Sequence, residues 1–285
     1  MARKTDFFGQ AKAIAAGATQ TLTWTTTELP SDGVIAYHVA MSGDGVGSND
    51  LSDVSRIRVS ANGANIINET PTQLRSYLES YSNGNITLDA NETRFTIPLL
   101  MLDAMLPDYQ DLCQFPMSSP VQLELTIAGA GAVAGNALVS FTLSNITPQC
   151  FPRRLAQVMN IGAGVQNQRF QFQENGVVRG IHVPRTGINR IRMVIDGDDV
   201  THEPGPDFND QANLFGDLSR ESQRIYGDGE FITTSGYTRI SKGSPAPTQR
   251  SYIELATDLA NWAGATNEAV IYAVAPQVGA AVAGS

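Results

Sequence analysis

The stretch SRIRVSANGANI at residues 55–66 recurs without gaps as NRIRMVIDGDDV at residues 189–200. In both copies Arg-Ile-Arg lies in a strand-like run, and a glycine follows at the same spacing. The dipeptides Asn62-Gly63 and Asp196-Gly197 tolerate the positive φ angles of a tight hairpin turn. The chain is therefore predicted to contain the same β-hairpin twice, which indicates an internal repeat.

Two further matches flank this pair in the same order along the chain. Upstream, Tyr37-His38-Val39 matches Ile181-His182-Val183. A glycine follows each histidine five residues later, at Gly43 and Gly187. The first copy then carries a polar, glycine-rich insertion at about residues 44–53. Downstream, Arg94 and Ile97 are matched with the residues Arg250 and Ile253 of the second copy. Matches in a constant order favour a tandem duplication over a chance similarity between two unlike β-domains.

A helix is predicted after each hairpin. In the first copy Thr70 is a suitable N-cap, Pro71 suits the first helical turn, and Gly84 ends the helix. Its predicted apolar face is formed by Leu74, Leu78 and Tyr81. The counterpart in the second copy is residues 207–226.

The rest of the sequence is typical of strands and turns. Hydrophobic residues make up 42% of the chain and charged residues 16%, which favours an all-β fold, and 285 residues suit two modules of about 140 residues each. Residues 138–144 alternate strictly between apolar and polar, as a strand with one buried face requires. The predicted strands are residues 20–25, 34–41, 54–60, 93–99, 121–127 and 138–144 in the first copy, and 169–173, 177–183, 190–195, 231–234, 237–240, 252–255 and 269–275 in the second.

These patterns predict the following domain organisation. The chain divides into an N-terminal arm (1–18), a first β-module (19–147), a linker (148–167), a second β-module (168–276) and a C-terminal tail (277–285). Apolar residues at helical spacing predict a short amphipathic helix at residues 5–17 of the arm. This helix would dock on its own domain, on a neighbouring subunit, or on a membrane surface, and the sequence does not choose among them.

The charge distribution argues against nucleic-acid binding. The formal net charge is −9, and no run of Lys and Arg exists that would contact phosphates. Residues 196–230 hold ten acidic residues against two arginines and are predicted to be a solvated surface. Of the 19 basic residues, 16 are arginine, a choice that favours pre-organised ion pairs of the kind found between packed subunits.

No motif in the sequence predicts catalysis or a cofactor. Because His38 and His182 occupy equivalent strands of the repeat, a structural role is favoured for both. The best metal candidate is a structural calcium site in the second copy, and a weaker one lies in the insertion; the alternative for both is a solvated loop. Their carboxylates are Asp196, Asp198, Asp199 and Glu203 in the first case, and Asp44, Asp50 and Asp53 in the second. Cys113 and Cys150 are expected to be free, buried thiols, because a disulfide scaffold needs denser cysteine.

The repeat resembles the double jelly-roll major capsid proteins of tailless, membrane-containing icosahedral bacteriophages of the corticovirus type, whose lineage includes adenovirus hexon. The resemblance covers about residues 18–276, and its basis is the two Arg-Ile-Arg strands, their Gly turns and the order of elements. It implies two tandem eight-stranded antiparallel jelly-roll β-barrels with short helices in the connecting loops.

The resemblance also implies a function and partners. The chain would be a virion capsid protein without enzymatic activity, forming pseudo-hexagonal homotrimers that pack with neighbouring capsomers into an icosahedral shell. Minor capsid or spike proteins would be further partners, the N-terminal arm would face an internal membrane, and no sequence-specific nucleic-acid contact is expected. Two other readings stay open: a tandem β-sandwich carbohydrate-binding or virion attachment protein with exposed aromatic residues, and an enzyme that uses a carboxylate pair such as Asp198 and Asp199.

Overall fold

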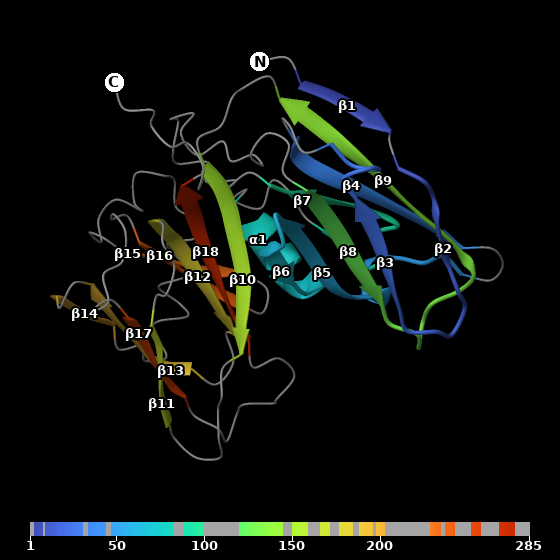
Figure 1. Ribbon diagram of the computed structural model, residues 1–285. Coiled ribbons are helices and arrows are strands. Elements are labelled where there is room, and N and C mark those ends of the chain that lie inside the picture. The colour runs from blue at the N-terminus through green and yellow to red at the C-terminus, as the bar shows by residue number, and fades with distance from the viewer. Residues whose placement is uncertain are drawn as a thin grey trace, which may run out of the picture. The chain divides into compact units, whose positions relative to one another are not determined.

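The computed structural model describes residues 3–7, 9–30, 34–43, 47–81, 88–99, 120–144, 150–158, 166–171, 177–184, 188–195, 198–202, 229–234, 237–242, 252–257 and 268–276. Strands dominate these residues, as the composition predicts, together with one α-helix, α1 (Pro71–Tyr81), and one 3-10 turn, η1 (Leu51–Asp53) (Figure 1). The chain divides into two compact units, residues 1–155 with 276–285 and residues 156–275.

Unit 1 contains two sheets. One has the strand order β1-β9-β4-β7, with β2 also paired to β9, and the other has the order β10-β6-β5-β8-β3. Neighbouring strands in both sheets run antiparallel, except that β10 pairs with β6 in parallel. The strands are β1 (Arg3–Phe7), β2 (Lys12–Ile14), β3 (Gln20–Thr25), β4 (Val34–Gly43), β5 (Val54–Ala61), β6 (Ala64–Glu69), β7 (Arg94–Pro98), β8 (Val121–Ile127), β9 (Gly135–Ser144) and β10 (Cys150–Val158).

The core of unit 1 follows from the alternation of apolar residues along these strands. In β8, Val121, Leu123, Leu125 and Ile127 are buried while the residues between them are partly exposed. Large apolar side chains of both sheets contribute to this core: Trp24, Tyr37, Val39, Ile57, Val59, Phe95, Ile97, Val139 and Phe141. Strand β8 thus buries one face, which is why the period of two predicts it well.

The hairpin that anchors the repeat has the predicted turn. Ala61 pairs with Ala64, so that Asn62 and Gly63 alone connect β5 to β6. Their φ angles are 52° and 76°, both in the left-handed region. This is the backbone that favours Asn-Gly in two-residue hairpins.

Helix α1 begins and packs as predicted. The Thr70 hydroxyl accepts a hydrogen bond from the Gln73 backbone N–H at 3.3 Å, and the Gln73 side chain accepts one from the Thr70 N–H at 2.7 Å. These reciprocal bonds form a capping box. Leu74 and Leu78 are buried, together with Tyr77 between them. The predicted counterpart at residues 207–226 lies outside the described residues.

The helix predicted at residues 5–17 is wrong, because the N-terminal arm forms strands β1 and β2 instead. Both strands pair with β9, Arg3 opposite Ser144 and Lys12 opposite Ala137. A helix of this length is marginal by itself, whereas the edge of β9 offers a continuous row of backbone partners. Of its predicted apolar face, Ile14 is buried, but the adjacent Ala15 is exposed.

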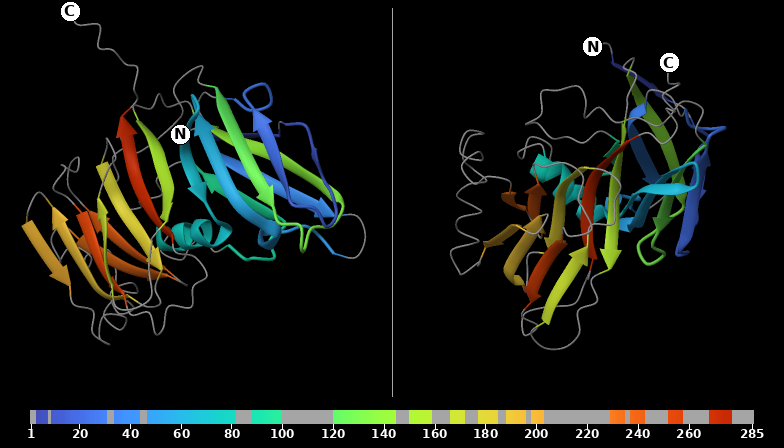
Figure 2. Two further views of the ribbon diagram at one scale, coloured as in Figure 1. Left: turned by 60° about the horizontal axis from the view of Figure 1, so that its bottom comes forward. Right: turned by 60° about the vertical axis from the view of Figure 1, so that its left-hand side comes forward.

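Unit 2 also contains two groups of paired strands. One has the order β15-β16-β12-β18 and the other the order β11-β17-β13-β14. Their bounds are β11 (Gln166–Gln171), β12 (Val177–Pro184), β13 (Ile188–Ile195), β14 (Asp198–His202), β15 (Gly229–Thr234), β16 (Tyr237–Lys242), β17 (Tyr252–Thr257) and β18 (Glu268–Pro276). Figure 2 shows the strands of each unit from two further directions.

The two units repeat the same strand order. The order β9-β4-β7 in unit 1 corresponds to β18-β12-β16 in unit 2, and β3-β8-β5-β6 corresponds to β11-β17-β13-β14. Irregularities in the pairing recur as well. The register shifts between Val34 and Ala36 and again between Val178 and Gly180. In both units the shift lies between the positions four and two residues before the matched histidine. Because bulges are specific structural features, their recurrence supports a duplication.

The same topology corrects the downstream match. Arg94 and Ile97 lie in β7, and the strand of unit 2 that corresponds to β7 is β16. Ile253, however, lies in β17, which corresponds to β8 of unit 1. The correct partner of Ile253-Glu254-Leu255 is Leu123-Glu124-Leu125, because Glu124 stands opposite Arg58 and Glu254 opposite Arg192. The downstream match rests on one Arg and one Ile, which are too few residues to identify corresponding strands.

The predicted linker at residues 148–167 is also wrong. It contains strand β10, in which Arg154 pairs with Ile67, and the first residues of β11. Its proline and polar residues resemble a connector, but Pro152 lies within β10 itself. Prolines are accommodated in strands where no ladder hydrogen bond is needed from their nitrogen.

Candidate functional site

The weaker metal candidate in the insertion proves to be a backbone cap. The Asp50 carboxylate accepts a hydrogen bond from the Ser52 N–H at 2.9 Å, and Asp53 accepts one from the Asp50 N–H at 3.0 Å. These bonds close a capping box around η1. Asp44, the third predicted ligand, lies outside the described residues. Asp50 and Asp53 therefore have a structural role, which leaves fewer oxygen lone pairs for a cation.

Asn49 anchors the insertion to the start of β9. Its side chain is fully buried and donates to the carbonyl oxygens of Ser42 at 2.8 Å and Val133 at 2.9 Å. It also accepts a hydrogen bond from the Val133 N–H at 3.0 Å. One amide thus satisfies three backbone groups that the strands leave without partners, and it fixes where the chain enters β5.

We expect Asn49→Ala to lower the free energy of unfolding by about 1–3 kcal/mol, because it leaves buried backbone groups without partners. Urea denaturation measures this change. Ser52→Ala is the matched control, since Ser52 is exposed on the same loop. Equal stability of the two variants would show that the Asn49 amide is not a structural anchor.

The principal calcium candidates are only partly described. Asp198 and Asp199 are consecutive residues of β14, paired with Ile195 and Val194 of β13, whereas Asp196 and Glu203 lie outside the described residues. Among the residues that the structure describes, no three His, Cys, Asp or Glu side chains form a group suited to a metal ion. The calcium site at Asp196, Asp198, Asp199 and Glu203 stays a prediction.

His38 lies in the middle of a sheet rather than in a catalytic cleft. Its Nδ1 is 2.9 Å from the Thr96 hydroxyl on β7, and its Nε2 is 2.6 Å from the Thr142 hydroxyl on β9. The three side chains form a polar row across β7, β4 and β9. Burial lowers the pKa of His38, because a half-buried imidazole is poorly solvated in its charged form. This environment supports the predicted structural role.

The lowered pKa of His38 predicts a loss of stability in acid. The unfolded chain takes up a proton on this residue as the pH falls below about 6.5, whereas the folded chain resists it. The stabilising contribution is present above that pH and decreases as the pH falls toward the folded-state pKa. We expect the free energy of unfolding to fall less between pH 7 and pH 5 in His38→Gln than in the wild type. Urea titrations at several pH values measure this, and parallel pH profiles would contradict it.

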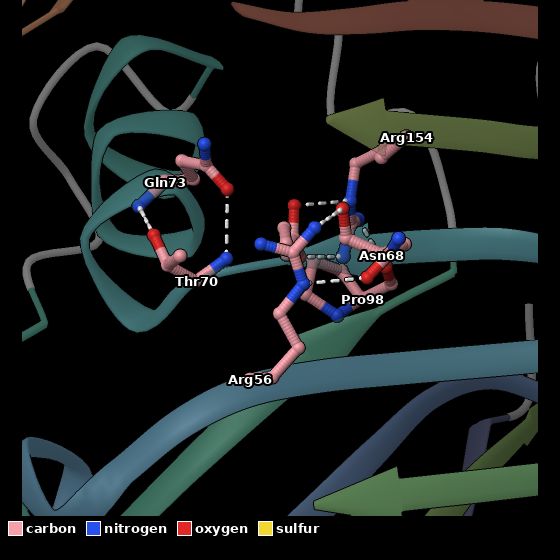
Figure 3. A network of polar contacts seen from close by, with 7 residues as sticks. Arg56, Asn68, Thr70, Gln73, Pro98 and Arg154 are labelled. Atoms are coloured by element: carbon pink, nitrogen blue, oxygen red, sulfur yellow. Dashed lines mark hydrogen bonds and ion pairs between the residues drawn. The ribbon is translucent and has the colours of Figure 1, made fainter. Parts of the chain in front are cut away.

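A buried ion pair involves Arg154, in the middle of β10 (Figure 3). The Arg154 guanidinium donates to both carboxylate oxygens of Glu69, at 2.7 and 3.2 Å, and to the carbonyl oxygen of Pro98. Both side chains are fully buried. Arg154 also lies over the Tyr77 ring, 4.4 Å from its centroid. The pair thereby links β10 to β6, β7 and α1 within unit 1.

The electrostatics of this ion pair combine opposing effects. Burial raises the pKa of Glu69, while the charges of Arg154 and Arg56 oppose the rise. Arg56 donates from Nε to the Asn68 side chain at 2.6 Å. Sequence patterns do not reveal the pair, because Glu69 and Arg154 are 85 residues apart and Arg154 falls in the segment predicted as linker.

The outer face of the β3-β8-β5-β6 sheet is polar and carries an ion pair. Arg58 Nη1 lies 3.0 Å from the Glu124 carboxylate, and their side chains are 45% and 20% exposed. Threonines on β3 continue this face, where Thr21 stands opposite Thr126 and Thr23 opposite Glu124. This exposed polar face is the candidate functional surface of unit 1.

The aromatic side chains of unit 1 that the structure describes lie inside. Every aromatic side chain whose burial the structure describes is buried: Trp24, Tyr37, Tyr77, Phe95 and Phe141. The Trp24 indole N–H donates to the Gln10 carbonyl at 3.1 Å and holds the N-terminal arm against the sheet. Trp262, the other tryptophan, lies outside the described residues. This part of the chain therefore lacks the exposed aromatic platform that the carbohydrate-binding reading predicts.

The strand order of the two units defines the class of fold. Two antiparallel sheets of this order form a jelly roll, a β-sandwich with Greek-key connections. Two such units in tandem make the chain a double jelly-roll protein, the fold of viral major capsid proteins. Neither a protein-family model nor a curated protein matches the sequence.

Solved structures support this fold over nearly the whole chain. The major capsid protein P2 of bacteriophage PM2 is similar with a TM-score of 0.63 and 13% identity, covering 97% of this chain and 98% of that one. The major capsid protein of STIV, the Sulfolobus turreted icosahedral virus, has a TM-score of 0.58 and 11% identity, covering 96% of each chain. The PBCV-1 capsid protein has a TM-score of 0.51 and 12% identity, with 96% and 93% covered.

Proposed function

We propose that the chain is the major capsid protein of a virus and that its function is to build the virion shell. The observation that supports this most strongly is the duplicated jelly roll, similar over 97% of the chain to the PM2 capsid protein. A fold by itself does not fix a function, so assembly of the purified protein is the decisive test. No step of this role requires catalysis.

The duplication suits a trimeric building block. Three chains with two similar modules each place six jelly rolls around one axis, which approximates a hexagon and packs closely into a sheet or shell. Neighbouring trimers, and minor capsid or spike proteins, are the partners of such a block. Because residues 3–7 and 12–14 form strands rather than a helix, a membrane contact through an amphipathic N-terminal helix is not part of this proposal. Within the described residues, no helix is long and apolar enough to cross a membrane.

Purified protein tests this proposal directly. We expect native mass spectrometry to show three chains of 30.5 kDa each in one particle, about 92 kDa in total, and electron microscopy to show larger assemblies as the concentration rises. Protein that stays monomeric over a wide range of salt and concentration would contradict the proposed function.

A further inference from the structure

The strand register that brings Arg58 opposite Glu124 in unit 1 recurs in unit 2. In unit 1, Arg58 on β5 stands directly opposite Glu124 on β8. In unit 2, Arg192 on β13 stands directly opposite Glu254 on β17. These strands correspond in the two strand orders, so the Arg–Glu pair occupies the same position of the fold twice.

The surrounding register is repeated as well. The pairing of β5 with β8 is interrupted between Val54 and Arg56, and that of β13 with β17 between Ile188 and Arg190. Each interruption lies just before the Arg-Ile-Arg sequence. The bulge and the Arg–Glu pair are therefore kept together, at one fixed register, in both units.

Other positions of the same strands have diverged between the units. Asn68, opposite Arg58, corresponds to Thr201, opposite Arg192. Glu69, which forms the buried ion pair, stands opposite Ile57. Its counterpart in unit 2 is His202, which stands opposite the equivalent Ile191. Thr96, opposite His38, corresponds to Arg239, opposite His182. The Arg–Glu pair is thus retained, whereas Glu69 and Thr96 correspond to residues of different charge.

Stability of the single chain is a small reason to retain this pair. An exposed cross-strand ion pair contributes little to the stability of the fold, because water screens it and both side chains lose freedom. Arg58 is nearly half exposed, so most of its charge stays available outside the sheet. A surface that shows one positive and one negative group is also complementary to itself, because the Arg of one copy matches the Glu of another.

We propose that these Arg–Glu positions are inter-subunit contacts, with the sheet β3-β8-β5-β6 at Arg58–Glu124 and the corresponding sheet β11-β17-β13-β14 lying against neighbouring copies of the same chain. This inference rests on the proposed capsid function and specifies which surface performs the assembly. The planar guanidinium of Arg suits such contacts, since it can bind a second carboxylate while it keeps the first.

Two charge variants test the inference. The acidic variant carries Arg58→Glu and Arg192→Glu, and the basic variant carries Glu124→Arg and Glu254→Arg. Each variant has like charges within both pairs and so has no attractive contact of its own. We expect both to fold with a melting temperature within a few degrees of the wild type, and each alone to need at least about tenfold more protein to assemble. An equimolar mixture should assemble at a lower concentration than either variant alone, because acidic and basic copies then attract each other at most of their contacts.

The mixture separates contacts between copies from contacts within one copy. If the pairs act only within a chain, mixing restores nothing, and that result would overturn the inference. The single variant Arg94→Glu is the control for the single variant Arg58→Glu, because both change the net charge of the chain equally. Arg94 is an exposed arginine on the other sheet of unit 1. An equal assembly defect in both single variants would also count against the inference. Failure of the wild type to assemble would overturn the proposed function as well, whereas wild-type assembly with unaffected variants would overturn the inference alone.

Discussion

Replacing Gly135 by alanine is expected to destabilise unit 1 by about 3 kcal/mol or more, the range of strong backbone clashes and overpacking. Gly135 begins β9 opposite Gly43 of β4, where the two strands approach closely. A Cβ at this position would lie 1.8 Å from the Ser42 carbonyl oxygen, which is backbone and has no rotamer to adopt. The same oxygen accepts a hydrogen bond from Asn49, so a shift of Ser42 would also disturb the anchor of the insertion. Urea denaturation and the yield of soluble protein measure the effect.

Gly63→Ala provides the comparison. Gly63 has a positive φ of 76°, but no atom lies within 4 Å of its Cβ position. Its substitution should cost about 1–2 kcal/mol, the penalty of a left-handed conformation for a residue with a side chain. If Gly135→Ala proves no more destabilising than Gly63→Ala, the close pairing of β4 and β9 is described incorrectly.

Removal of Arg154 is expected to have the second large effect. In Arg154→Met the Glu69 carboxylate stays buried without a cation, which should lower the free energy of unfolding by about 3–5 kcal/mol at neutral pH. The deficit should narrow as the pH falls, because protonation of Glu69 removes the uncompensated charge. The sign follows from the raised pKa that burial gives this carboxyl, since such a group destabilises the fold as the pH rises.

The double variant Glu69→Leu with Arg154→Met distinguishes an ion pair from a packing effect. Replacing both charges by apolar groups should recover much of the stability lost in Arg154→Met, because no charge is then buried alone. Arg58→Met, at the exposed pair, should cost only about 0.2–1 kcal/mol. Additive effects of Glu69→Leu and Arg154→Met in a double-mutant cycle would contradict the direct contact between the Arg154 guanidinium and the Glu69 carboxylate.

The sequence predicts those parts of the fold whose signal is local. The alternation in β8 and β9 and the Thr70-Pro71 start of α1 are visible in short windows, and the structure has strands and a helix there. The Asn62-Gly63 turn is equally local, since two residues determine it. Arg-Ile-Arg reveals the duplication because the same strand, with the same bulge, was kept in both units.

Features that depend on distant partners could not be predicted in this way. The segment containing β2 has the spacing of an amphipathic helix, but β9, more than 120 residues away, offers it an edge with which to pair. Strand β10 looks like a linker because its proline and polar residues suit connectors, yet Arg154 within it is buried against Glu69. The Arg–Glu pairs of the proposed interface need the strand registers, which no single stretch of sequence specifies.

The central claim is that this chain assembles into a shell, and native mass spectrometry of the purified wild-type protein combined with electron microscopy tests it most directly. The account predicts particles of three chains that associate into hexagonally packed sheets or closed shells as the concentration is raised. Monodisperse monomers with intact β-structure at every salt concentration tested would contradict it.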